Sequence, residues 1–398
     1  MPYNKYSNMI LSYLSIALYI FVLLFVGYDL LFALFSFLYK EKRPKSNESE
    51  QRFLVLFPAY KEDEVIIDSV TEFLKQDYPQ EKYTVCVISD HMKDETNLKL
   101  ESLPIRLIKV NFEVSLKSKA INEALQQSEG YDKVIIMDAD NVTTSDFLTR
   151  VNQRSIHTEA LQLHRKWKNT HTSVATWDAI AEEINNSIYR KGHVVTGLSS
   201  ALIGSGMVFN FEWLKKHMHE CKTFAEDREL EVILVRNKIR VEYAHEIHVY
   251  DEKTSFRDVL LKQRTRWTHA QFIAFKLILP LIRFDRHYLD KVIQWFPFPK
   301  QIRIVVILTI MFIFCFISLE FAFYWFLLFI IQLTALSLAV PKRMYNKQLL
   351  IHLTKLPGLV FLLVKSYISS FYRMKHKDMS FSNTPHHTTT SQDIKKEI

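Results

Sequence analysis

The sequence predicts an α/β protein in which a mostly parallel sheet forms a domain flanked by transmembrane helices. Between residues 53 and 140, short uninterrupted apolar runs alternate with amphipathic segments of helical period, which is typical of a parallel sheet covered on both faces. Long apolar stretches with almost no charge lie near both ends, whereas the middle has the charge content of a soluble protein. The 398 residues suffice for one large domain or two ordinary ones.

The N-terminal apolar stretch, residues 9–39, predicts a membrane anchor, because it is far longer than the apolar core of a signal peptide. Residues 10–28 are long enough to span, so we expect Asp29 to reach the headgroups, with a functional intramembrane acid as the alternative. Basic residues cluster after this stretch and only Lys5 precedes it, which predicts an external N-terminus and a cytoplasmic domain after residue 45. The following basic residues are Lys40, Lys42, Arg43 and Lys45.

The C-terminal third predicts further membrane segments. Residues 304–319 and 321–340 are apolar stretches separated by little more than Glu320, which predicts a helical hairpin with its turn outside. Residues 349–372 have basic residues on both sides, which favours an interfacial or re-entrant segment over a simple crossing. Residues 270–282 are too short to span and are expected in the interface. The expected divisions are 1–45 (anchor and basic flank), 46–269 (cytoplasmic α/β domain), 270–300 (interfacial), 301–376 (hairpin plus interfacial or re-entrant segment) and 377–398 (polar tail).

Composition excludes several classes of function. The net charge is +8, but the basic residues gather beside apolar stretches, which favours anionic lipid headgroups over nucleic acid. No zinc spacing, aromatic-basic repeat, Gly-x-Gly-x-x-Gly or Walker loop is present, which argues against nucleic acid, a dinucleotide and a P-loop nucleotide as ligands. The three cysteines are far apart and are expected to be reduced.

Polar residues follow the predicted strands at the points where each strand ends. In parallel sheets, ligands bind at the carboxyl ends of strands. The run "IIMDADN" places Asp138 and Asp140 at such an end, and hard carboxylate oxygens suit Mg²⁺ or Mn²⁺. A solvated Asx turn that caps the next helix is the alternative. The predicted strands are 53–60, 84–90, 105–110 and 133–140, and the predicted helices are 63–76 and 117–128.

Further motifs favour binding of an anionic nucleotide. Asp90 ends a neighbouring strand, and Lys117 lies near the start of a helix whose positive end attracts phosphate. Four of the seven glycines fall between Gly192 and Gly206, which indicates backbone with positive φ or close approach to a ligand. A turn-rich loop and ordinary surface lysines are the respective alternatives.

Two later motifs complete the set. Glu226-Asp227 opens an amphipathic helix, where an acidic first turn is also common for electrostatic reasons alone. "QRTRW", residues 263–267, combines arginines suited to a diphosphate with a tryptophan that offers a flat face to a sugar. Interfacial anchoring is the alternative for this motif.

Taken in order, "PAYKE", "SD", "KSKAIN", "DAD", "GSGMVF", "ED" and "QRTRW" resemble the membrane-bound family 2 glycosyltransferases. That group includes cellulose, hyaluronan and poly-N-acetylglucosamine synthases. The resemblance covers about residues 53 to 270 and implies a GT-A fold, a nucleotide-sugar donor, Mg²⁺ or Mn²⁺, and transfer with inversion. Two departures leave the nucleotide and the sugar open: "VISDHMKDET" lacks the usual double Asp and Gly, and Leu116 stands where Gly is frequent.

The resemblance also implies roles for individual residues. Asp227 would be the general base, and Asp140 would bind the metal together with Asp138. The implied donor-binding residues are Asp90, Lys117, Asp138 and Arg266, and the implied acceptor-binding residues are Gln263, Trp267 and Gly206.

The function we expect is a multi-pass enzyme of the cell (inner) membrane that transfers a sugar, with a UDP-sugar as the expected donor, to a growing glycan. A single addition to a lipid-linked acceptor is the alternative, because three spans and a fourth uncertain segment are few for a channel within one chain. A catalytically inactive, membrane-tethered binding protein is a minor alternative. The expected partners are the donor, a glycan or lipid-linked acceptor and membrane lipid, with no nucleic acid; a partner subunit stays open.

Overall fold

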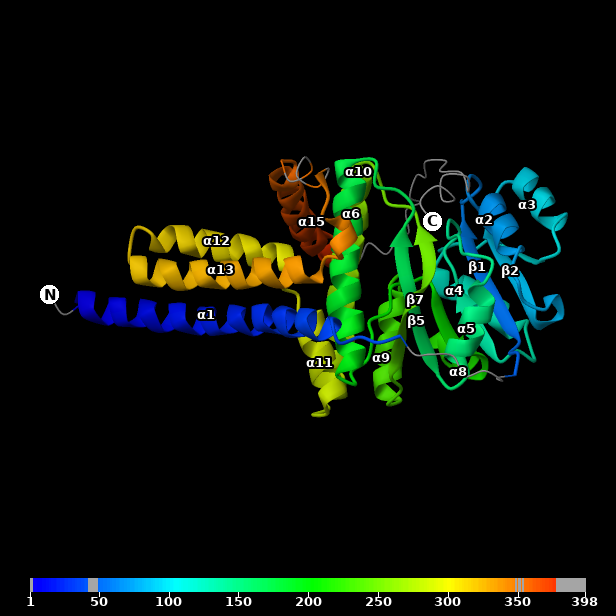
Figure 1. Ribbon diagram of the computed structural model, residues 1–398, viewed down its shortest axis with the longest axis horizontal. Helices are drawn as coiled ribbons and strands as arrows, with labels where there is room; N and C mark the ends of the chain where they lie inside the picture. The colour runs from blue at the N-terminus through cyan, green and yellow to red at the C-terminus, as the bar shows by residue number, and fades with distance from the viewer. Residues whose placement is uncertain (1–2, 42–48, 348, 350–351, 353, 377–398) are drawn as a thin grey trace.

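The computed structural model describes residues 3–41, 49–347, 349, 352 and 354–376. Two predicted features lie largely or wholly outside these residues: the basic linker that follows the anchor and the polar tail from 377. An α/β domain carries a bundle of long apolar helices that projects from one side (Figure 1).

Seven strands form one mixed sheet of order β3-β2-β1-β4-β6-β5-β7. β1 pairs in parallel with β2 and β4, β2 with β3, and β5 with β7, whereas β6 runs antiparallel to both β4 and β5. The predicted α/β, mostly parallel sheet is therefore confirmed. The strands are β1 Phe53–Tyr60, β2 Tyr83–Asp90, β3 Arg106–Val110, β4 Lys133–Ile136, β5 Ala160–Trp167, β6 Met207–Asn210 and β7 Val241–Asp251.

Both faces of the sheet are covered, as the uninterrupted apolar strands predict. On β1, Phe53, Val55 and Phe57 pack into one fully buried cluster, whereas Leu54 and Leu56 pack into another on the opposite face. This alternation follows from the two-residue period of a strand. Each such side chain contributes about 1.5–3 kcal/mol on burial, so the sheet centre provides a rigid base for the residues at its edges.

Helices cover the sheet and connect it to the projecting bundle. The helices of the domain are α2 Ile66–Phe73, η1 Gln80–Lys82, α3 Asp94–Glu101, α4 Lys117–Gln126, α5 Phe147–Ser155, α6 Ser173–Asn185, η2 Asn186–Gly192, α7 His193–Val195, α8 Phe211–His217, η3 Met218–Glu220 and α9 Glu226–Arg236. The others are α1 Tyr3–Ser36, α10 Arg257–Ile278, η4 Leu279–Leu281, α11 Arg286–Trp295, α12 Lys300–Phe314, α13 Leu319–Ala339, η5 Lys342–Met344 and α15 Leu356–His376.

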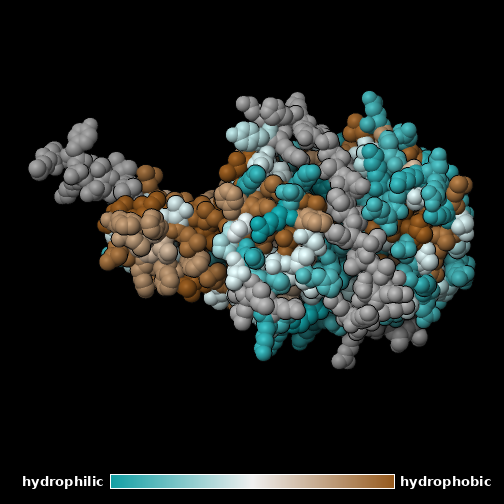
Figure 2. Space-filling model, turned by 90° about the horizontal axis from the view of Figure 1, so that it is seen from above, coloured by the Kyte–Doolittle hydropathy of each residue, from teal (hydrophilic) through white to brown (hydrophobic). Residues whose placement is uncertain are grey.

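The projecting bundle consists of α1, α12 and α13, and apolar side chains gather on its surface (Figure 2). Two of its segments are long and apolar enough to cross a membrane, Tyr13–Ser36 and Leu319–Ala339. A third span arises if α11 and α12, which meet at a 65° bend, are counted as one broken helix. In Figure 1, α10 and α15 stand across the direction of the bundle.

Two expectations about the membrane segments need revision. Asp29 does not face headgroups, because it is fully buried in the bundle, where it pairs with Arg303 and accepts a hydrogen bond from Gln332 Nε2 at 3.3 Å. Residues 270–278 do not form a separate segment: they continue α10, so the division expected after residue 269 falls inside a helix.

Candidate functional site

The carboxyl ends of β1, β2 and β4 meet at one edge of the sheet. Register pairs Tyr60 with Asp90, and β4 ends at Ile136, so Asp138 and Asp140 follow in a turn beyond the strand. Asp90 is buried, and its Oδ1 lies 2.6 Å from His91 Nδ1 and 3.3 Å from the Phe112 backbone N. The sheet topology therefore carries all three predicted carboxylates to this edge.

Lys117 connects four separate segments at the site. Its ammonium forms an ion pair with Asp138, donates to the carbonyl of Gly204 at 2.7 Å and lies 3.9 Å from Glu226. Burial lowers the pKa of Lys117, but Asp138 and Glu226 raise it by more, so the lysine keeps its charge. Asp138 is the exposed member, with a third of its side-chain surface accessible.

Asp140 is held more tightly than Asp138. Its side chain is buried, Oδ2 accepts from the Glu252 backbone N at 3.1 Å, and Oδ1 accepts from Asn141 Nδ2 at 3.2 Å. Its carbonyl accepts from the Lys168 ammonium. The two aspartates of the motif thus differ in accessibility, and only Asp138 presents much carboxylate surface.

A buried network of four charges lies behind this turn. Arg165 Nε donates to Glu182 at 2.6 Å, and Lys253 Nζ donates to Asp251 at 2.7 Å and also pairs with Glu182. Burial raises the pKa of Glu182, but the two cations outweigh it and hold the pKa well below its usual range. Arg165 also lies 3.9 Å from Asp138, so this network extends to the carboxylate of Asp138.

The acidic pair at the start of α9 lies beside Lys117. Burial raises the pKa of Glu226 to about 8; Lys117 opposes this shift and Asp227 adds to it. Asp227 keeps part of its surface exposed, and its Oδ1 accepts from the Arg228 backbone N at 2.8 Å. Burial also raises the pKa of Asp227, and the charge of Arg228 opposes this shift.

The "QRTRW" motif lies on α10, which packs against α9. Arg264 pairs with Asp178 of α6, and its guanidinium lies 4.4 Å from the ring centroid of Trp267. Arg264 therefore connects α10 to α6. Gln263 and Arg266 lie on the same helix and are part-exposed.

Two positions of the predicted loop require glycine for different structural reasons. Gly206 has a φ of +60°, and a Cβ there would lie 3.0 Å from Val249. Gly192 has an ordinary φ of −58°, but a Cβ there would lie 2.2 Å from the carbonyl oxygen of Phe32. The second glycine thus permits close approach of α1, not of a ligand.

The donor set at the site fits a divalent ion only in part. Within the residues that the structure describes, no three His, Cys, Asp or Glu side chains are grouped closely enough to hold a metal ion. Asp138 and Asp140 offer the hard oxygens that Mg²⁺ and Mn²⁺ prefer, so phosphate oxygens of a ligand would have to complete the coordination.

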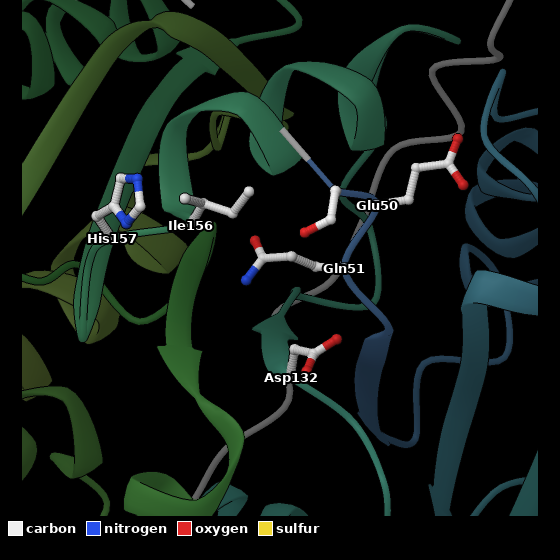
Figure 3. Close-up of a pocket in the computed structure, with 6 residues that line it drawn as sticks. Glu50, Gln51, Asp132, Ile156 and His157 are labelled. Atoms are coloured by element: carbon white, nitrogen blue, oxygen red, sulfur yellow. The ribbon is translucent and has the colours of Figure 1, made fainter. Parts of the chain in front are cut away.

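An open pocket of about 440 Å³ lies at the other end of the strands (Figure 3). Gln51 and Asp132 line it, and they immediately precede the amino ends of β1 and β4. It is therefore separate from the carboxylate cluster.

The mixed sheet of this order, with acidic residues at the carboxyl ends of its strands, has the GT-A fold. The chain belongs to the glycosyltransferase family described as "Glycosyltransferase like family 2", whose model matches residues 51–270, more than half of the chain. The resemblance to family 2 glycosyltransferases is therefore confirmed, whereas the membrane-bound, synthase-like subtype stays a prediction.

Solved structures with a similar fold include the mannosyltransferase PcManGT from Pyrobaculum calidifontis, in complex with GDP-Man and Mn²⁺. It is 14% identical, with a TM-score of 0.57, over 91% of this chain and 99% of that one. A second is residues 1–349 of TarS from S. aureus in complex with UDP-GlcNAc, 16% identical with a TM-score of 0.42, over 83% and 93% of the two chains. No curated protein matches the chain.

Proposed function

We propose that the protein is a membrane-anchored, inverting glycosyltransferase that moves a sugar from a nucleotide-sugar donor, with a UDP-sugar expected, to a glycan. The observation that carries this proposal is the joining of Lys117, Asp138 and Glu226 at the sheet edge, with Asp227 next in the chain. A cation for phosphate, a carboxylate for the donor and an acid with a raised pKa thus lie together.

In this proposal Asp227 is the general base. A sugar hydroxyl has a pKa far above 7, so its attack on the anomeric carbon requires a base that removes the proton as the bond forms. Attack opposite the leaving diphosphate inverts the configuration. Lys117 and Arg266 would hold the diphosphate, Asp90 the nucleoside, and Gln263, Trp267 and Gly206 the acceptor.

Asp140 and Asp138 would hold Mg²⁺ or Mn²⁺ together with phosphate oxygens of the donor. When bound, such an ion neutralises charge that develops on the leaving diphosphate. The mannosyltransferase of similar fold was solved with GDP-Man and Mn²⁺, which supports trying both ions and both a guanosine and a uridine donor.

The proposal places α1 and α13 across a membrane, in a multi-pass arrangement, with the α/β domain on the cytoplasmic side. Exposed apolar side chains on these helices support the insertion, among them Leu14, Ile20, Leu319 and Phe323. Lys342 and Arg343 follow α13 directly, and the positive-inside rule puts that end in the cytoplasm.

Replacing Asp227 with Asn tests the assignment of the base. D227N should bind nucleotide sugar as the wild type does, because the fold keeps its shape, but transfer should fall by about a hundredfold or more. Exposed Asp94, which lies in the first turn of α3 as Asp227 lies in the first turn of α9, gives the matched control D94N. Transfer by D227N at the wild-type rate would remove Asp227 from the mechanism.

Product length separates two forms of the proposal. A processive, synthase-like enzyme gives a ladder of products, whereas a single-addition enzyme gives one sugar per acceptor. Only two described helices, or three with the bent pair, are long enough to cross, which supports a single addition to a lipid-linked acceptor as the second candidate. An inactive binding protein would hydrolyse no donor.

A further inference from the structure

Basic side chains gather around Tyr189, at the junction between the α/β domain and the apolar bundle. Tyr189 lies on η2, a π-helical segment, and the ammonium of Lys300 lies 3.9 Å from its ring centroid. Lys300 is the first residue of α12 and donates to Asn185 Oδ1 at 2.9 Å. Arg190 follows Tyr189 directly, and its charge repels that of Lys300.

Neither Lys300 nor Arg190 has a carboxylate within 4 Å among the side chains that the structure describes. Arg190 is nearly fully buried and donates only to neutral groups, the Ala201 carbonyl at 3.2 Å and Asn186 Oδ1 at 2.8 Å. Burial lowers the pKa of Arg190, which records the cost of keeping its charge there. Buried cations without an anionic partner are costly and rare in proteins.

The other cations near Tyr189 already have partners. Arg303 pairs with Asp29, and Arg228 Nη1 donates to Glu231 at 2.7 Å. Asp29 also attracts Lys300 at longer range, so these two carboxylates are shared among four cations. The cluster of Lys300, Arg190, Arg228 and Arg303, which we call the Tyr189 basic cluster, carries more positive than negative charge.

The Tyr189 basic cluster lies between the candidate active site and the apolar helices. On one side, Arg228 is adjacent in the chain to Asp227. On the other, the Arg303 guanidinium lies 5.7 Å from the ring of Phe25, which packs against Phe296 and Phe298. In Figure 1, α12 begins where the bundle meets α11 and the domain. An anion bound here would have apolar surface beside it.

We propose that Lys300 binds a phosphate group carried on a lipid, and that the positive charge of Arg190 strengthens this binding. Lys300 keeps part of its surface exposed, so it is the cation that a ligand can reach. Lysine and arginine hold phosphate through charge-assisted hydrogen bonds, which would supply the missing anion. If the proposed transferase function holds, this lipid phosphate is that of the acceptor, held beside Asp227; bulk anionic phospholipid offers the same chemistry.

The test measures binding without any donor sugar. The full-length protein, purified in detergent, is titrated with polyprenyl phosphate and with polyprenol of the same chain length, and bound lipid is counted by native mass spectrometry. The wild type should bind the phosphate form at least tenfold more tightly. K300Q should lose this difference, whereas K342Q, which removes an exposed lysine at the end of α13, should keep it.

Each outcome decides the inference. Equal binding of polyprenol and polyprenyl phosphate, or unchanged binding by K300Q with an unchanged melting temperature, would overturn it. Displacement of polyprenyl phosphate by equimolar phosphatidylglycerol would keep the phosphate site and assign it to bilayer headgroups, whereas resistance to displacement assigns it to a lipid-linked acceptor. Because no transfer is measured, wild-type turnover by D227N would refute the base and leave this result standing.

Discussion

Glu231 is the residue whose replacement should have the widest effect outside the proposed chemistry. Only 1% of its side chain is exposed, and it accepts from three donors: Arg228 Nη1 of the same helix at 2.7 Å, the Leu202 backbone N at 3.1 Å and Lys291 Nζ of α11 at 2.5 Å. It lies one turn after Asp227 on α9. E231Q keeps the shape of this residue and removes its charge.

The expected loss of stability follows from burial. Lys291 is also 1% exposed, so E231Q leaves a buried ammonium without its carboxylate, although Gln294 Oε1 remains at 2.8 Å. Breaking a buried pair costs about 3–5 kcal/mol, and the remaining hydrogen bond favours the lower end. The double variant E231Q/K291M should recover part of the loss, because it removes both charges.

Thermal unfolding followed by tryptophan fluorescence measures this effect. The control is E72Q, which breaks the exposed pair between Lys75 and Glu72 and should cost under about 1 kcal/mol. E231Q should melt several degrees lower than E72Q. If both variants melt at the wild-type temperature, or if the double variant is less stable than E231Q, Glu231 does not hold these elements together.

The same variant should shift the pH dependence of transfer. Burial raises the pKa of Asp227 first, and the negative charge of Glu231 raises it further, while Arg228 opposes both. Removing the charge of Glu231 therefore lowers the pKa of Asp227. A general base works when it is unprotonated, so the acidic limb of the rate profile should move to lower pH in E231Q. A limb that stays in place contradicts Asp227 as the base.

Three further changes have clear expected outcomes. G192A should lower the melting temperature strongly, because its Cβ would lie 2.2 Å from the Phe32 carbonyl oxygen, whereas G27A, with nothing within 4 Å, should not. Glu226 has a folded pKa of about 8, so the folded state binds its proton more tightly and the stability of the wild type falls as pH rises from about 5 to about 8. E226Q lacks this loss, so its gain in melting temperature over the wild type should grow through this window and stay constant above it. K117M should raise the KM for the donor at least tenfold, measured by nucleotide release, and an unchanged KM would exclude Lys117 from the donor site.

Much of the fold follows from local patterns in the sequence. The apolar runs at 53–60 and 84–90 match β1 and β2 closely, because both strands are buried on both faces and have few alternatives. The run at 133–140 is too long as a strand: β4 ends at Ile136, since the chain must turn to place its carboxylates at the edge. The sequence of β6 contains no pattern that distinguishes an antiparallel strand from a parallel one.

The candidate site is only partly readable from the sequence. Asp90, Lys117 and Asp138 could be found because Asp90 ends a strand, Lys117 opens a helix and Asp138 follows an apolar strand closely. Glu226, with a pKa of about 8, could be found only as half of an acidic pair, since its shift depends on burial. The supporting network of Arg165, Glu182, Asp251 and Lys253 left no pattern, because these residues come together only through β5, α6 and the end of β7.

The contacts around Glu231 also connect the proposed chemistry to the apolar bundle. Lys291, which pairs with Glu231, lies on α11 beside Asp290, and Asp290 Oδ1 accepts from the hydroxyl of Tyr28 on α1 at 2.7 Å. Two buried polar contacts, on adjacent residues of α11, thus join the helix of Asp227 to the first apolar helix. Y28F removes the hydroxyl that contacts both Asp290 and His193 Nε2, each at 2.7 Å, and should cost about 1–3 kcal/mol, because both partners are buried. If these contacts position Asp227, Y28F should lower kcat more than it raises KM; a change in stability alone would limit Tyr28 to holding α1 against the domain.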